Sequence, residues 1–254
     1  MELKKELVET DIKRRSAEKS SKKNKLLISI VIPLYNEEKS IKKVLSKIPY
    51  DENYEILVVD DGSTDNSVQK IQEINDPRIN IIKHEQNQGY GKAILSGFKY
   101  SKGSIVVTLD SDGQHNPEEI SRVIRPIKFN KADMIIGSRY LGKSNYKVPL
   151  YVRTGEMVIS YILWVFFGNK INNNQSGFRA FNRKSINCIK YTKDTGMGFT
   201  TEILFRSCQS NLRLREIPIT VNPRMHGVSR VHLIKLIKSI LLCVAYYFFR
   251  KYKS

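Results

Sequence analysis

The stretch Ile105-Val106-Val107-Thr108-Leu109-Asp110-Ser111-Asp112-Gly113-Gln114-His115 joins an apolar run to a compact polar turn. The apolar part predicts a buried strand, and the carboxyl end of such a strand faces the ligand crevice of open α/β sheets. Asp110, Asp112 and the Gln114 amide form an oxygen-rich cluster that suits a divalent cation whose remaining ligands are phosphate oxygens. The alternative is a polar turn that only caps the helix expected near Pro117. The rest of the chain decides between the two.

A strand followed by a helix recurs along the first half of the chain. Apolar runs predict strands at Leu26–Pro33, Tyr54–Val59, Ile79–Lys83, Ser104–Leu109 and Asp133–Gly137. Apolar residues at helical spacing predict amphipathic helices between them, with faces formed by Ile41, Val44, Leu45 and Ile48, by Val68, Ile71 and Ile74, and by Ile120, Val123, Ile124 and Ile127. This alternation predicts an α/β fold, with a mostly parallel sheet and helices on both faces.

After Tyr140 the regular alternation ends. The pattern predicts helices over Tyr151–Phe167, Thr200–Ser210 and Val231–Arg250, strands over Gly177–Asn182 and Leu212–Val221, and a basic loop over Pro223–Arg230. The chain then divides into three parts. Residues 1–25 form a charged arm that is flexible or helical, residues 26–230 form one globular domain, and residues 231–254 form a basic amphipathic helix.

The charge of the chain points to an anionic partner. Its 254 residues carry a formal net charge of +18, and residues 203–254 hold ten Lys or Arg but one acid, Glu216. Because these basic residues interleave with long apolar runs and no nucleic-acid-binding motif is present, an anionic membrane surface is favoured over nucleic acid. Three scattered cysteines without a CxxC pair indicate a reducing compartment, and the dispersed histidines argue against a zinc site.

Three further motifs follow predicted strands, where a nucleotide would bind. They are Ile32-Pro33-Leu34-Tyr35-Asn36-Glu37, Val58-Val59-Asp60-Asp61-Gly62-Ser63-Thr64-Asp65 and Asn87-Gln88-Gly89-Tyr90-Gly91-Lys92. Tyr35 can support a base or ribose, and Asp60 and Asp61 can accept hydrogen bonds from base N–H groups or ribose hydroxyls. Helix caps and turns would explain Glu37 and Ser63 equally well. They would not explain two adjacent acids at a strand end.

Six short motifs in order resemble those of family 2 glycosyltransferases, which have the GT-A fold, a Rossmann-like mostly parallel sheet. They are Pro33-Leu34-Tyr35-Asn36-Glu37, Val59-Asp60-Asp61-Gly62-Ser63, Asp110-Ser111-Asp112-Gly113-Gln114-His115, Ile136-Gly137-Ser138-Arg139-Tyr140, Ser176-Gly177-Phe178-Arg179 and Arg224-Met225-His226-Gly227-Val228-Ser229-Arg230. Within that family the chain most resembles the polyprenyl-phosphate and dolichyl-phosphate mannose or glucose synthases. The resemblance implies transfer of a monosaccharide from a nucleotide-diphosphate sugar, of GDP-mannose or UDP-glucose type, to a lipid phosphate.

The resemblance also implies a role for each matching residue. Asp110, Asp112 and Gln114 would bind Mg²⁺ or Mn²⁺, which would neutralise the leaving diphosphate. Tyr35, Glu37 and Asp61 would contact the nucleoside, and the other substrate-binding residues would be Pro33, Asp60, Lys92, Arg179 and Glu202. Arg139, Arg153, Arg224 and Arg230 would surround the acceptor phosphate, although any one of them could instead be a solvated or membrane-facing cation. Asp112, Arg139 and Arg224 are the expected catalytic residues.

The region around Glu202 bears on the acceptor. Relatives carry a Glu-Asp pair there as a general base, but no Asp follows Glu202 in this chain. A phosphate monoester needs no base, because its second pKa of about 6 leaves it largely dianionic at neutral pH. The missing pair therefore favours a lipid phosphate acceptor and a single inverting displacement, and it leaves Glu202 to orient the sugar or to pair with an arginine.

Two uncharged segments are candidates for contact with a bilayer. Met157–Phe167 and Ser239–Phe249 each have 11 residues, whereas a spanning helix needs about 20. We expect interfacial helices at the cytoplasmic face of a membrane. The alternatives are that Met157–Phe167 is a buried core helix, or that a helix starting at Val231 spans the membrane.

Other functions are compatible with parts of the sequence. The enzyme could use another membrane acceptor such as a diacylglycerol, although the missing base counts against it. A non-catalytic nucleotide-sugar-binding membrane protein is disfavoured by the intact Asp110, Asp112 and Gln114. Nucleic-acid binding is suggested by charge alone. The sequence indicates neither the donor sugar, nor a protein partner, nor an oligomeric state.

Overall fold

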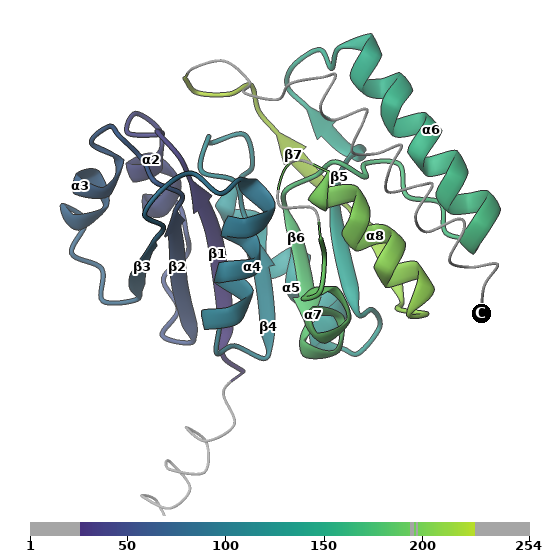
Figure 1. Ribbon diagram of the computed structural model, residues 1–254, viewed down its shortest axis with the longest axis horizontal. Helices are drawn as coiled ribbons and strands as arrows, with labels where there is room; N and C mark the ends of the chain where they lie inside the picture. The colour runs from purple at the N-terminus through teal and green to yellow at the C-terminus, as the bar shows by residue number, and fades with distance from the viewer. Residues whose placement is uncertain (1–25, 194–195, 197, 227–254) are drawn as a thin grey trace, which may run out of the picture.

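The computed structural model describes residues 26–193, 196 and 198–226 (Figure 1). Its strands are β1 Ile28–Leu34, β2 Tyr54–Asp60, β3 Ile79–Lys83, β4 Ile105–Thr108, β5 Met134–Ser144, β6 Arg179–Asn182 and β7 Leu214–Val221. Its helices are α2 Ile41–Ser46, α3 Ser67–Gln72, α4 Tyr90–Tyr100, α5 Ile120–Lys128, α6 Leu150–Phe167, α7 Arg183–Ile189 and α8 Phe199–Gln209, with a 3₁₀ turn, η1, at Pro117–Glu119. The α/β class predicted from sequence is confirmed.

The described strands form one sheet in the order β3-β2-β1-β4-β6-β5-β7. The first four are parallel, and β5 and β7 are parallel to each other. Strand β6 runs antiparallel to both of its neighbours, β4 and β5. Because β1 lies between β2 and β4, the loops that follow β1, β2 and β4 meet at one edge of the sheet. This edge is where open α/β sheets bind ligands.

Two hydrophobic layers cover the sheet, as its alternating side chains require. On one face Ile30, Ile32 and Leu34 of β1 belong to a cluster with buried residues of α2 and α5. On the other, Val31 of β1 belongs to a cluster with residues of α4, α6 and α8. Figure 1 shows α4 and α8 in front of the strands. Helices on both faces are therefore confirmed.

Helix α6 has little of its surface inside the protein. Its buried residues are Glu156, Ile159, Ser160 and Leu163, and 22% of the helix is buried. By length and composition it is the one described helix able to cross a membrane. Tyr161 is 63% exposed and Trp164 is 55% exposed. The alternative that Met157–Phe167 is a core helix is therefore wrong.

The predicted elements differ from the observed ones in the second half of the chain. Strand β5 continues to Ser144, beyond the predicted end at Gly137, and helix α7 was not expected from the sequence. Nothing in the sequence pattern marked β6 as antiparallel. The predicted arm at 1–25, most of the basic loop after Pro223 and the predicted helix over 231–254 lie outside the described residues. The proposed division into three parts stays a prediction.

Candidate active site at the carboxyl ends of β1, β2 and β4

Asp110 lies two residues after the end of β4, with its carboxylate pressed against the backbone of Gly177. A Cβ atom at position 177 would lie 2.2 Å from Asp110 Oδ2, so any larger residue there would displace the carboxylate. The Tyr90 hydroxyl donates to Asp110 Oδ1 at 3.2 Å, and His115 Nδ1 lies 3.4 Å from Oδ2. The side chain keeps 27% of its surface exposed. Contacts on two sides thus define its position while the side chain stays partly accessible to solvent.

Asp112 is more deeply buried and is held by its own turn. Its Oδ1 accepts the Gln114 backbone N–H at 3.0 Å. Burial and the neighbouring Asp110 carboxylate raise the pKa of Asp112, which means that the site disfavours a second negative charge. A positive ligand would relieve this repulsion.

The turn does not cap the helix that follows it. The N-terminal cap of η1 is Asn116, whose side chain accepts the Glu118 N–H, and neither aspartate takes part. The cap interpretation of the two acids is therefore wrong. No described group of three or more His, Cys, Asp or Glu side chains could hold a metal ion. Two carboxylates, one amide and substrate phosphates are nevertheless a donor set that fits Mg²⁺ or Mn²⁺.

Arg224 joins this acid cluster to the loop after β1. The segment after β7 is pinned to the acid turn, because Asn222 N–H donates to Gln114 O at 2.8 Å and Met225 N–H donates to Asp112 O at 3.3 Å. Arg224 Nη2 forms an ion pair with Glu37, and Arg224 Nε lies 3.9 Å from Asp112 Oδ2. Two predicted catalytic residues, Asp112 and Arg224, are thus brought together with Glu37.

Asp61 organises the third predicted motif. It accepts the Gln88 N–H at 2.9 Å and the Gly89 N–H at 2.8 Å, and it lies 2.7 Å from His84 Nδ1. The other ring nitrogen of His84 contacts the Ser96 hydroxyl at 2.9 Å. The sequence analysis missed His84. The sequence feature that could have identified it is its position directly after β3, because the neighbouring strand β2 ends just before Asp61.

The remaining nucleotide-facing residues occupy the places expected from their strands. Pro33 is buried in β1, and Tyr35, the first residue after that strand, is half-buried. Asp60 accepts the Ser63 N–H at 3.0 Å. Lys92 is exposed in the first turn of α4. Their contacts with a nucleotide stay predictions.

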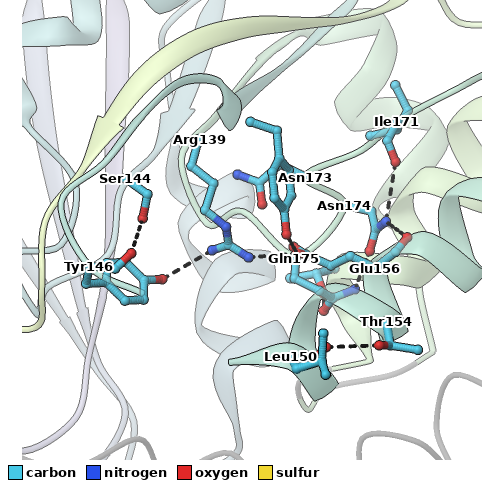
Figure 2. Close-up of polar contacts among 12 residues, drawn as sticks. Arg139, Ser144, Tyr146, Leu150, Thr154, Glu156, Ile171, Asn173, Asn174 and Gln175 are labelled. Atoms are coloured by element: carbon cyan, nitrogen blue, oxygen red, sulfur yellow. Dashed lines mark hydrogen bonds and ion pairs between the residues drawn. The ribbon is translucent and has the colours of Figure 1, made fainter. Parts of the chain in front are cut away.

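Arg139 extends from β5 toward Glu156 of α6 (Figure 2). Its Nη2 lies 2.7 Å from Glu156 Oε2, and its Nη1 donates to the Tyr146 hydroxyl at 3.3 Å. The Tyr140 hydroxyl donates to the same Glu156 oxygen at 2.5 Å. Burial and this carboxylate raise the pKa of Tyr140, which keeps its hydroxyl a donor. The sequence analysis missed Glu156, although it is the one acid in a mostly apolar helix.

Two cavities open beside Arg139 and share two lining residues, Tyr140 and Arg153. The larger is about 670 Å³ and is lined by Tyr140, Arg153, Glu156, Met157, Ser160, Tyr161, Trp164, Lys170 and Asn172. The smaller is about 520 Å³ and is lined by Tyr140, Tyr146, Lys147, Val148, Leu150 and Arg153. Cationic side chains and exposed apolar side chains therefore share one surface next to Arg139.

Two predicted substrate contacts lie inside the protein. Arg179 is 2% exposed, and its guanidinium donates to the carbonyls of Ser176, Thr200 and Asn174 at 2.7, 3.0 and 2.7 Å. Burial lowers its pKa to about 10. Because these donors are already used, Arg179 holds the loop that precedes β6, and its contact with a substrate stays a prediction.

Glu202 lies in the first turn of α8. It pairs with Arg206 at 3.2 Å, and both of its oxygens accept the Lys193 N–H. Pairing with an arginine, one of the two roles expected for Glu202, is confirmed. Arg230 lies outside the described residues.

Comparison with known proteins identifies the family. Residues 29–190 match the family described as Glycosyl transferase family 2. The chain is 34% identical over 213 residues to UDP-N-acetylglucosamine–dolichyl-phosphate N-acetylglucosaminyltransferase of Methanococcus voltae. This alignment covers 76% of this chain and 84% of that protein. It is 29% identical to polyprenol monophosphomannose synthase of Mycolicibacterium smegmatis over 216 residues, 80% of each chain.

A solved structure shares the fold. Glucosyl-3-phosphoglycerate synthase from Mycobacterium tuberculosis, in complex with Mn²⁺, UDP and glucosyl-3-phosphoglycerate, superposes with a TM-score of 0.67. The alignment has 20% sequence identity and covers 87% of this chain and 80% of that one. The likeness confirms the GT-A-like architecture that the sequence motifs implied.

Proposed function

Because the chain belongs to glycosyl transferase family 2, we propose that it transfers a monosaccharide from a nucleotide-diphosphate sugar to a polyprenyl or dolichyl phosphate. That it is a glycosyltransferase follows from the family itself. The finer statement rests on the site. The relatives named above, whose names specify dolichyl-phosphate and polyprenol acceptors, support it.

The observation that carries the proposal is the cavity that Tyr140 and one side of α6 form next to Arg139. Arg153 and Lys170 line the 670 Å³ cavity, and the exposed apolar side chains Tyr161 and Trp164 line it as well. A phosphate attached to a long apolar chain needs both kinds of side chain within a short distance. A soluble acceptor would leave the apolar wall without a role.

On the donor side, Asp110, Asp112 and Gln114 would hold Mg²⁺ or Mn²⁺. When bound, the ion supplies positive charge to the diphosphate that leaves. Arg224, beside Asp112, adds a second positive charge at the same place. Tyr35, Glu37, Asp60, Asp61 and Lys92 would line the nucleotide, as their positions at the ends of β1 and β2 and at the start of α4 suggest.

The acceptor side is arranged for a nucleophile that is already charged. Glu202 is engaged with Arg206 and with the Lys193 N–H. A phosphate monoester dianion attacks without a general base, so a carboxylate is not needed there. Arg139, Arg153 and Arg230 would orient that phosphate for in-line attack on the anomeric carbon, with inversion of configuration.

The exposed face of α6 supports a location at a membrane surface, which we propose is the cytoplasmic face. The helix carries aromatic and aliphatic side chains outward, and basic residues such as Lys147 and Arg153 lie near its start. This composition is typical of a helix that lies in the headgroup region of an anionic bilayer. We include this interfacial location in the proposal.

One transfer assay tests the proposal. The protein is incubated with labelled nucleotide sugars, including GDP-mannose, UDP-glucose and UDP-N-acetylglucosamine, together with a polyprenyl phosphate and Mg²⁺ or Mn²⁺. We expect label in the lipid phosphate, dependence on the cation and an inverted anomeric product. Transfer to diacylglycerol but not to polyprenyl phosphate, or retention of configuration, would contradict it.

A further inference from the structure

Glu156 is an acid in an unfavourable place. It is the one acidic residue of α6, and it is 2% exposed although most of the helix surface is open. Burying a carboxylate is costly unless it is paired, and an apolar residue of similar size often stabilises a fold equally well. The position of Glu156 therefore calls for a reason other than stability.

The contacts of Glu156 leave part of its binding capacity unused. The hydrogen bonds that Arg139 Nη2 and the Tyr140 hydroxyl donate to its side chain both end on Oε2. Among the described residues, Glu156 Oε1 and Arg139 Nε are buried and have no hydrogen-bond partner. Glu156 also lines the 670 Å³ cavity. Unpaired buried polar atoms at a cavity wall indicate a ligand that completes the network.

We propose that Glu156, which lines the cavity together with Tyr140, is a positioning residue: it holds the neighbouring Arg139 guanidinium in the orientation in which Arg139 meets the acceptor phosphate. The inference rests on the proposed function. It assigns Glu156 no contact with the sugar and no proton transfer. Arg139 keeps its charge in the pair.

The same contact links α6 to the sheet. Arg139 belongs to β5, whereas Glu156 belongs to the helix whose apolar face is exposed. The backbone carbonyl of Glu156 also accepts Asn174 Nδ2 at 2.8 Å, which ties this turn of α6 to the loop before β6 (Figure 2). A shift of α6 at a membrane would therefore be transmitted to the orientation of Arg139.

Steady-state kinetics with a short-chain polyprenyl phosphate test the role. We expect Glu156→Gln to raise the acceptor KM about tenfold and to change the donor KM less than twofold, because only the placement of Arg139 is lost. Glu156→Asp retains the charge but retracts it by one methylene, so its acceptor KM should lie between those of wild type and the Gln variant. If the Gln variant is unstable, the Asp variant carries the same test.

Non-additivity separates positioning from a general structural role. In an Arg139→Ala background, Glu156→Gln should change the acceptor KM less than twofold, because the group that it positions is gone. Asp133→Asn is the matched control. It breaks a buried carboxylate–arginine pair next to the start of β5, and we expect it to lower thermal stability without changing the acceptor KM.

Two results would overturn the inference alone. They are an unchanged acceptor KM in a folded Glu156→Gln or Glu156→Asp variant, and an equal rise of KM with and without Arg139. In both cases wild-type protein still transfers sugar to the lipid phosphate. If wild-type protein makes no such transfer while it glycosylates another acceptor, the proposed function fails, and this role of Glu156 fails with it.

Discussion

Two arginine–carboxylate pairs lie along β5, and they are built differently. Asp133, just before the strand, has both oxygens in use. Its Oδ1 accepts Asn182 Nδ2 and Arg213 Nη2, each at 2.9 Å, and its Oδ2 accepts the Arg213 N–H and Nε at 2.9 and 3.0 Å. These contacts join β5, β6 and β7 at the edge of the sheet away from the acid cluster.

The second pair, Arg139 and Glu156, lies further along the same strand and is incomplete. One carboxylate oxygen and one guanidinium nitrogen have no partner among the described residues, and Glu156 lines a cavity. A pair that only holds the fold can be saturated, whereas a pair that must receive a ligand keeps atoms for it. The degree of saturation thus distinguishes a structural pair from a site pair in one strand.

The largest effect is expected for Asp112→Asn, in the acid cluster after β4, where a site carboxylate rather than a structural one is changed. We expect the rate of transfer to fall about 10³-fold, because the variant loses one of the two carboxylates that would hold the cation at the leaving diphosphate. Burial and Asp110 raise the pKa of Asp112, so its ionised form destabilises the folded state at neutral pH. The neutral Asn side chain removes this cost, and the variant should unfold at a temperature no lower than that of wild type. Transfer assays and thermal unfolding measure the two effects. Normal transfer in this variant would refute the metal assignment.

Arg139→Lys tests the incomplete pair directly. Lysine keeps the charge but cannot form the planar, forked contacts of a guanidinium. We expect kcat/KM for the lipid phosphate to fall about 100-fold, since a buried charge contact with the acceptor is broken. Arg213→Lys, in the saturated pair, is the control and should leave kcat/KM near the wild-type value. A similar loss of kcat/KM in both variants would contradict the functional difference between the two pairs.

Asp133→Asn tests the saturated pair through stability. We expect the free energy of unfolding to fall by about 2 kcal/mol, because the charge-assisted hydrogen bonds of a buried carboxylate are weakened. The Arg213 side chain lowers the pKa of Asp133, so this contribution is present above the unfolded pKa of about 4 and is lost as the pH falls below it. Denaturant titrations at pH 7 and pH 3 should show a smaller acid sensitivity in the variant. Equal acid sensitivity would contradict the role of this pair.

Trp164→Ser tests the smallest expected effect, at the outer wall of the cavity. Loss of one exposed aromatic side chain from α6 should weaken binding to anionic vesicles about tenfold. Tyr100→Ser, which removes an exposed aromatic residue from α4, is the control in a vesicle sedimentation assay. Equal binding of both variants and wild type would argue against an interfacial α6.

The acid cluster and the nucleotide loops could be predicted from sequence because they are local. Each follows an apolar run that predicts a strand, and parallel strands bring their carboxyl ends to one edge whatever the details of packing. Asp110, Asp112 and Glu37 therefore lie near one another as expected. Arg224 could be added because it lies in a motif that resembles the family's.

Other features depended on contacts between distant segments. The antiparallel β6 is inserted between β4 and β5, and four residues with no alternation carry no signal of direction. Arg179 and Arg139 each lie in a motif, but the guanidinium of Arg179 donates to backbone carbonyls, whereas that of Arg139 pairs with Glu156, which lines a cavity. The difference lies in which carbonyls and carboxylates surround each guanidinium.

Sequence alone accounts for the α/β class, the family and the placement of the acids at strand ends, because periodicity and short motifs encode local structure and strand order. Tertiary packing decided which face of α6 is buried and that Glu156 points inward to Arg139. It also left the Arg139–Glu156 pair unsaturated while the Asp133–Arg213 pair is complete. Hydrogen-bond saturation depends on donors from segments far apart in the chain, so no local pattern of residues contains it.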